Sequence, residues 1–333
     1  MTTTRTRTTI LATLLAALAA AATTGCIPRS FTINLDSPKG PVREATVQGN
    51  PRDPDKVALI DLVGVIGSGG LLGGAAIDID DTALMLREAE QDPAVKAIVL
   101  RIDSPGGGVG DSHTIYQLIR DAKDRSNKPV IAAMDSVAAS GGYYIALAAD
   151  TIIAKPTTVT GSVGVIIPAI NASQGLESIG IVSRSITSGD NKDLASPAAP
   201  VNPEHEAILQ AVVDDFYEQF RTLVVANRPN LEDPDATLDG RILTGRQALD
   251  AGLVDQLGNI NDAFQTAKDR AGLDLAQLVK YHRSSQTPAT PYASVQANTP
   301  NPLSALDRLP RITRSPGPGV YYLWLQPAAL ASP

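Results

Sequence analysis

Ser140 and Lys192 have the residue types of a serine hydrolase that uses lysine as its base. Ser140 follows the apolar run Pro129–Met134 and precedes two glycines, a pattern that predicts a sharp turn from a strand into a helix. Such a turn presents a hydroxyl beside backbone N–H groups, as acyl transfer requires. A serine needs a base, and a lysine acts as one only where burial lowers its pKa from about 10.4 toward about 7–8.

A second glycine-rich turn supports the same chemistry. The run Asp103–Gly108 follows the apolar segment Ala97–Ile102, and ligands bind at the carboxyl ends of parallel strands in α/β folds. An oxyanion hole needs two N–H donors near the developing charge. We expect one from Gly141 and one from Gly106 or Gly107.

The elements that must position these residues alternate along the chain. Short β-branched runs predict strands, and apolar spacings of three and four predict helices. The alternation indicates an α/β fold with repeated βαβ units, a mainly parallel sheet and a helical C-terminal part of the domain. The expected strands are Val57–Ile66, Ala97–Ile102, Val130–Met134, Thr151–Ala154 and Ile181–Ile186, and the expected helices are Asp81–Gln91, His113–Lys123, Ser140–Ala149, Pro203–Asn227, Gly245–Ala251 and Asn259–Arg270.

The N-terminus predicts export from the cytoplasm. Residues 1–25 have the basic start, short apolar run and small-residue end of a secretory signal. Cys26 is the only cysteine of the chain and follows Gly25. It resembles the lipidation site of a bacterial lipoprotein, with Thr23 where that motif usually has leucine. Ordinary cleavage nearby, with Cys26 as an incidental thiol, is the alternative. Either way, we expect an extracytoplasmic protein of the cell envelope, and a lipidated Cys26 would anchor it to a membrane.

Composition divides the remainder of the chain. Residues 26–55 lack periodicity and predict a tether, residues 56–275 carry the alternating strands and helices of one domain, and residues 276–333 form a proline-rich tail. Within the tail, Val320–Leu325 predicts either a peripheral strand or a docking segment. The net charge of −7 argues against a nucleic-acid partner. No cluster of metal ligands is evident, so neither metal nor cofactor is expected.

Several motifs in one order resemble peptidase family S49, the signal peptide peptidase A type, in its short single-repeat form. The resemblance covers about Val57–Gly272. The motifs are Asp103–Val109, Ser136–Tyr144, Thr160–Val165, Ser188–Leu194, Asp239–Ala248 and Gly252–Asp255.

The resemblance implies a Clp/crotonase-like fold and a catalytic dyad of Ser140 and Lys192. It also implies that Ser162 orients the lysine and that Gly107 and Gly141 are the oxyanion donors. Short members of the family assemble into homo-oligomeric rings in which the lysine reaches the serine of a neighbouring subunit. The expected substrates are peptides released at membranes, such as signal peptide remnants. The Val109 side of the glycine loop could bind such a peptide as an added strand.

Three other interpretations remain. The chain could be an inactive envelope scaffold with the same fold, although Ser140, Lys192 and Ser162 are all present. A crotonase-type acyl-CoA enzyme shares the paired N–H donors, but coenzyme A is cytoplasmic. His113 follows Asp111 and would allow a Ser–His–Asp site, although a surface histidine at a helix start is the simpler interpretation.

Overall fold

The structure is a computed structural model, and it describes residues 40–67, 76–284, 286–293 and 321–323. The predicted signal segment, Cys26 and most of the proline-rich tail therefore lie outside the described residues. Within those ranges, no helix combines the length and the apolar character needed to cross a bilayer.

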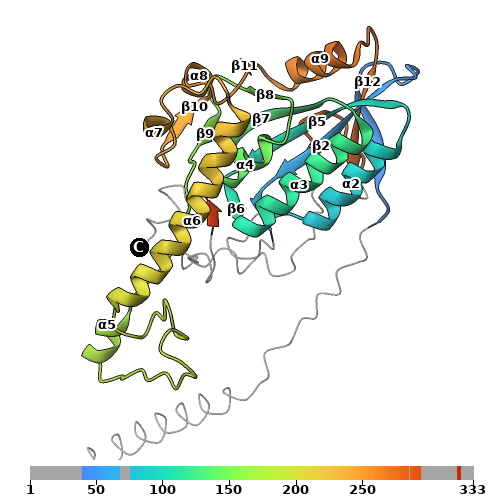
Figure 1. Ribbon diagram of the computed structural model, residues 1–333. Coiled ribbons are helices and arrows are strands. Elements are labelled where there is room, and N and C mark those ends of the chain that lie inside the picture. The colour runs from blue at the N-terminus through green and yellow to red at the C-terminus, as the bar shows by residue number, and fades with distance from the viewer. Residues whose placement is uncertain (1–39, 68–75, 285, 294–320, 324–333) are drawn as a thin grey trace, which may run out of the picture. The chain divides into compact units, whose positions relative to one another are not determined.

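Strands and helices alternate through most of the chain (Figure 1). The strands are β1 (Arg43–Gln48), β2 (Lys56–Val63), β3 (Val65–Ile66), β4 (Ala76–Ile77), β5 (Val95–Ser104), β6 (Gly106–Gly108), β7 (Val130–Ala139), β8 (Thr151–Ala154), β9 (Val159–Gly161), β10 (Ile242–Thr244), β11 (Gln256–Leu257), β12 (Gln277–His282) and β13 (Tyr321–Leu323). The helices are α2 (Ile79–Gln91), α3 (Val109–Ser126), α4 (Gly141–Ala146), α5 (Ser173–Ser178), α6 (Pro203–Asn227), α7 (Pro234–Thr237), α8 (Gly245–Asp250) and α9 (Ile260–Ala271).

The main sheet is largely parallel. Its strands run in the order β1-β12-β2-β5-β7-β8-β11, and β9 and β10 continue from β7. All neighbours from β12 to β11 are parallel, whereas β1 pairs antiparallel with β12. A second sheet has the order β13-β6-β3-β4. The predicted α/β class with a mainly parallel sheet is confirmed.

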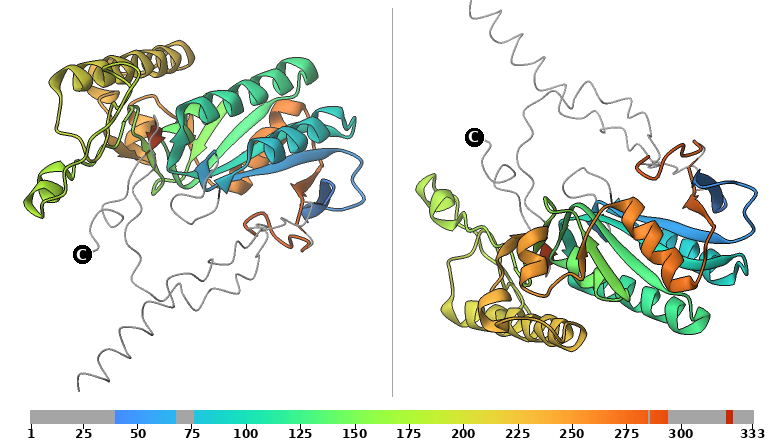
Figure 2. Two further views of the ribbon diagram at one scale, coloured as in Figure 1. Left: turned by 90° about the horizontal axis from the view of Figure 1, so that it is seen from below. Right: turned by 90° about the horizontal axis from the view of Figure 1, so that it is seen from above.

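Helices cover both faces of the main sheet (Figure 2). Side chains of α2, α3, α4 and α6 pack on one face, where aliphatic residues of β2, β5 and β7 are buried. On the other face, α9 packs its buried Ile260, Ala263, Phe264 and Ala267 against the alternate residues of the same strands. A strand buried on both faces reads as one apolar run, which explains why these strands could be found from sequence.

Most predicted elements are confirmed within a few residues, and α6 has the predicted bounds. Thr244 caps α8: its hydroxyl accepts from Gln247 N, and the Gln247 side chain accepts from Thr244 N in return. Two predictions differ from the structure. The run Val57–Ile66 is divided at Gly64, whose φ is +110°, so that Val65 and Ile66 join the second sheet. The predicted strand Ile181–Ile186 is wrong, because this segment has no strand and its residues are exposed.

The sheet extends past both predicted limits of the peptidase-like part, residues 56 and 275. β1 lies within the predicted tether, and β12 lies within the predicted tail. All six residues of β12 are buried between β1 and β2, with Leu278 beside Val57. The segments on either side of the predicted domain therefore complete its sheet.

Candidate active site

Ser140 stands at the turn that the sequence predicts. β7 ends at Ala139, and Ser140 has φ +54° and ψ −116°, a conformation rarely adopted outside glycine. Two backbone bonds hold it there: its N–H donates to Gly161 O at 2.8 Å, and its carbonyl accepts from Tyr144 N at 2.8 Å. Such a conformation costs roughly 1–3 kcal/mol and is typical of functional sites.

The hydroxyl of Ser140 is buried and has no hydrogen-bond partner among the described residues. The residue is only 1% exposed. A buried hydroxyl without a partner is costly, and structures usually satisfy it. The described part of the chain therefore supplies no hydrogen-bond partner, and no base, for the Ser140 hydroxyl.

The second glycine turn lies directly against the serine turn. A Cβ on Gly142 would lie 2.6 Å from the carbonyl oxygen of Ser104, so only glycine allows this approach. The N–H of Gly106 already donates to Ser104 Oγ at 3.1 Å. Of the two donors that the sequence left open in this loop, Gly107 is therefore the better candidate for an oxyanion, together with Gly141.

Ser162 also lies beside the nucleophile turn. It follows Gly161, whose carbonyl binds the N–H of Ser140, and its own N–H donates to Arg241 O at 2.7 Å. β9 and β10 pair here in antiparallel register, with Gly161 opposite Ile242. The motif around Arg241 thus supports the turn of Ser162, a role that neither the residues nor the family resemblance had assigned to it.

Lys192 is not brought to Ser140 within this chain. Its backbone N–H donates to Gly189 O at 3.1 Å, but its side chain is exposed and has no hydrogen bond or ion pair among the described residues. It lies in the segment between α5 and α6. The buried residues of α6, Phe220 and Val224, lie in the C-terminal half of that helix, away from this segment. In Figure 1 this segment lies at the end of α6 that is remote from the sheet.

His113 does not act on Ser140 in this structure. Its Nδ1 lies 3.0 Å from the hydroxyl of Tyr144, and the two rings meet edge to face. Burial raises the pKa of Tyr144 to about 12, so the phenol stays protonated at neutral pH. The Ser140 hydroxyl has no partner, which leaves the Ser–His–Asp interpretation without geometric support.

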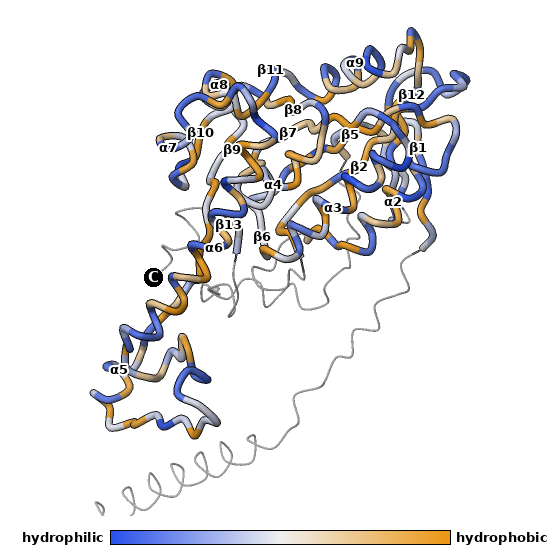
Figure 3. Tube along the Cα trace, in the orientation of Figure 1, coloured by the Kyte–Doolittle hydropathy of each residue, from blue (hydrophilic) through white to orange (hydrophobic). Residues whose placement is uncertain are grey.

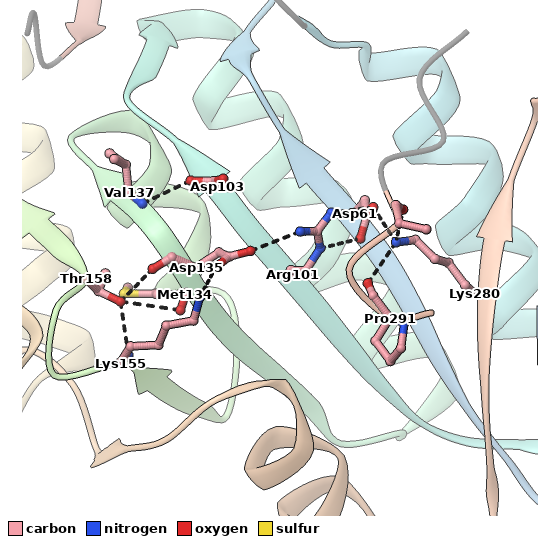
Figure 4. Close-up of polar contacts among 11 residues, drawn as sticks. Asp61, Arg101, Asp103, Met134, Asp135, Val137, Lys155, Thr158, Lys280 and Pro291 are labelled. Atoms are coloured by element: carbon pink, nitrogen blue, oxygen red, sulfur yellow. Dashed lines mark hydrogen bonds and ion pairs between the residues drawn. The ribbon is translucent and has the colours of Figure 1, made fainter. Parts of the chain in front are cut away.

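A row of charged side chains crosses the strands that lead into the site (Figure 4). Arg101 of β5 binds Asp61 of β2 through two bonds of 2.9 and 2.8 Å, and binds Asp135 of β7 at 3.0 Å. Lys155 pairs with Asp135 from the other side. Buried Lys280 of β12 continues the row with a 2.7 Å ion pair to Asp61.

The pKa values of two carboxyls in this region are shifted in opposite directions. Burial raises the pKa of Asp103, although a hydrogen bond from Val137 N opposes the shift. Burial acts in the same sense on Asp135, but its bonds to Lys155 and Arg101 outweigh burial and lower its pKa. Charge is therefore stabilised at Asp135 and disfavoured at Asp103, two residues that both lie close to the turns that form the site.

Two family models and several known proteins match this chain. The family model described as peptidase family S49 matches residues 122–274, and that of ClpP-like SDH-type serine proteinases matches residues 48–188. A protein of Synechocystis sp. that is named as a protease is 40% identical over 221 residues, which are 66% of this chain and 76% of the relative.

Two further relatives have similar identities. An Enterococcus faecium protein named as signal peptide peptidase SppA is 35% identical over 68% of this chain and 67% of its own length. Protease 4 of Salmonella typhi is 38% identical over 61% of this chain and only 32% of its own length. Solved structures of a membrane-bound stomatin-specific protease, one with a substrate peptide, align over 64% of this chain with a TM-score of 0.40 at 20% and 22% identity.

The fold and the matched models define a serine peptidase of the ClpP-like class. The chain belongs to peptidase family S49.

Proposed function

We propose that this protein hydrolyses peptides with a dyad in which Lys192 of one copy serves Ser140 of another. The observation that carries the proposal is the buried, strained Ser140 hydroxyl, which has no partner. The side chain of Lys192 is exposed and is equally without a partner among the described residues. A second copy would satisfy both groups at once, and burial in the contact would favour the neutral form that a base requires.

The segment that carries Lys192 also has the surface of an interface. Val182 is 83% exposed and Ile186 is 97% exposed, and Ile170 and Ile179 nearby are exposed as well. Figure 3 shows these apolar stretches along the segment between α5 and α6. Exposed apolar clusters of this kind mark association sites. The residues predicted as a strand in this segment would therefore be covered by another copy.

The chemistry follows from the groups present. Neutral Lys192 accepts the Ser140 proton as the serine oxygen attacks a peptide carbonyl, and the N–H groups of Gly141 and Gly107 stabilise the oxyanion. The protonated lysine then gives its proton to the leaving amine. Water, deprotonated by the same lysine, cleaves the acyl-enzyme and restores Ser140. No step requires a metal or cofactor.

The relative named as a signal peptide peptidase suggests the substrate class, namely signal peptide remnants and other peptides released at a membrane. The predicted secretory signal and the lipidation site at Cys26 would place the enzyme in the cell envelope, anchored on the extracytoplasmic side. An inactive scaffold with this fold is the alternative, and a covalent probe separates the two.

The test is fluorophosphonate labelling of the wild type, Ser140→Ala, Lys192→Ala and an equimolar mixture of the two variants. Among the three single proteins, we expect only the wild type to label. Its labelling should have a midpoint on the pH axis well below about 10.4, the pKa of a free lysine. The mixture should regain part of the labelling, because Lys192 of the Ser140→Ala copies can reach Ser140 of the Lys192→Ala copies. A mixture that stays silent contradicts the sharing, and an unlabelled wild type favours the scaffold.

A further inference from the structure

The C-terminal segment forms a strand beside the glycine turn of the candidate site. β13 pairs antiparallel with β6, with Tyr321 opposite Gly108, Tyr322 opposite Gly107 and Leu323 opposite Gly106. On its other edge, Tyr321 exchanges two backbone bonds of 3.0 Å with Ile166. The segment therefore lies between two stretches of main chain that are far apart in sequence.

Both stretches border the nucleophile. β6 contains the oxyanion candidate Gly107, and Ile166 lies four residues after Ser162. β13 also lies against α4, which begins directly after Ser140. An extended chain held in this way occupies the position in which a protease binds its substrate as an added strand.

The alternation of a strand places the tail on Gly107. Successive residues of a strand direct their backbone groups to opposite edges. Tyr321 uses its N–H and carbonyl on Ile166, so the backbone groups of Tyr322 are directed to the other edge, where Gly107 is its partner in register. The tail thus lies against the residue whose N–H we assign to the oxyanion.

The glycine strand is built to bind main chain and not side chains. A Cβ on Gly107 would lie 2.0 Å from Ile66 O, and a Cβ on Gly108 would lie 2.7 Å from the Asp111 carboxylate. No side chain fits at Gly107 or Gly108, so β6 can contact a bound peptide only through its backbone. Binding through main-chain hydrogen bonds accepts many sequences, so a tail and a substrate can use the same groove.

We propose that Tyr321–Leu323 is a tethered occupant of the groove between Gly106–Gly108 and Ile166, and that it competes there with substrates. The inference rests on the proposed function, because it assumes that Ser140 is the nucleophile beside this groove. A tethered segment acts at an effective concentration of order millimolar. Substrates that bind less tightly than this are excluded until the tail leaves.

The test uses the full-length chain in which Ser140→Ala prevents cleavage, and it measures amide hydrogen exchange of Ile166. In this chain the Ile166 amide should exchange slowly, because it donates to Tyr321 O. Tyr321→Pro removes the N–H that donates to Ile166 O and should release this protection, whereas the control Ala331→Pro, further along the tail, should retain it. A synthetic peptide of residues Pro318–Gln326 should restore protection to the Tyr321→Pro chain.

In chains with Ser140 intact, fluorophosphonate labelling should be about five- to tenfold faster for Tyr321→Pro than for Ala331→Pro. Fast exchange of Ile166 in the parent chain would overturn the proposal, because the groove would then be empty. Where the chains do label, loss of protection without faster labelling would equally overturn it, because occupancy would not obstruct the groove. Failure of the peptide to restore protection would also overturn it. If no chain labels but the exchange and peptide results hold, the proposed dyad fails while the tethered occupant stands.

Discussion

Asp135 should contribute about 2 kcal/mol to the stability of the sheet, and Asp135→Asn tests this value. The carboxylate binds Arg101 of β5 and Lys155, which directly follows β8; these two strands lie on either side of β7. Loss of one partner from a fully buried ion pair costs about 3–5 kcal/mol. Asp135 is 13% exposed and Lys155 is 30% exposed, so solvent screens part of the interaction and about 2 kcal/mol is the reasonable value.

The position of Asp135 explains why loss of its charge should lower the stability of the whole domain, which unfolds as one unit. Residues 131–134 of β7 pair with β8, and residues 137–139 pair with β9. Asp135 lies at the change between the two partners, five residues before Ser140. Its carboxylate fixes this junction to β5 through Arg101. Asparagine retains the shape of the side chain but not its charge, so the change isolates the electrostatic part.

Thermal and urea unfolding measure the effect. About 2 kcal/mol should lower the midpoint by roughly 4–8 °C for a domain of this size, and the urea m-value should stay constant. The matched control is Asp121→Asn, which removes an exposed carboxylate 3.8 Å from Arg125 and should leave the midpoint close to that of the wild type.

The dependence on pH provides the sharper test. The pKa of Asp135 is lowered in the folded state, so its stabilisation is present above the unfolded value of about 3.9 and is lost as pH falls through the folded value. The difference between wild type and Asp135→Asn should therefore be full at pH 7 and shrink below about pH 4. An equal difference at pH 7 and pH 3.5, or none at pH 7, would refute the electrostatic reasoning.

Two further substitutions test the packing and charge beside the site. Asp103→Asn retains the acceptor for Val137 N. The pKa of Asp103 is raised in the folded state, so ionisation of this carboxyl destabilises the fold as pH rises. In urea unfolding the variant should be at least as stable as the wild type at pH 7 but not at pH 3.5. Gly142→Ala places a Cβ 2.6 Å from Ser104 O and should cost about 1–3 kcal/mol and slow fluorophosphonate labelling, whereas Gly110→Ala, with no atom within 4 Å, should do neither.

The sequence alone located the strands and helices that have a clear apolar run or spacing, but it missed β12. Buried apolar runs such as Ala97–Ile102 identify themselves, because every residue lies in the core. β12 is equally buried but contains Lys280 and His282. Lys280 tolerates burial because it binds Asp61 and the carbonyl oxygens of two residues near the end of its own segment, Pro291 and Ala293. No spacing in the sequence shows those partners, so the strand read as tail.

The candidate site divides in the same way. The turns of Ser140 and Gly107 could be predicted, since glycines at fixed places report backbone geometry directly. The strand expected at Ile181–Ile186 was wrong in this chain, because a β-branched run predicts a strand only where a neighbour covers it. Its residues are exposed here, near Lys192. The apolar pattern indicated that these residues favour burial, but it could not indicate what would cover them.

The shared dyad and the tethered tail that we propose should respond differently to dilution. In the proposed dyad Lys192 comes from another copy, so labelling should fall as the protein is diluted below the range in which copies associate. The tail is part of the same chain as β6, so its occupancy of the groove is independent of protein concentration. A ratio of Tyr321→Pro to wild-type labelling that stays constant across a dilution series, while both rates fall, would separate the two conditions, and a ratio that changes with dilution would place the tail in the groove of a neighbouring copy.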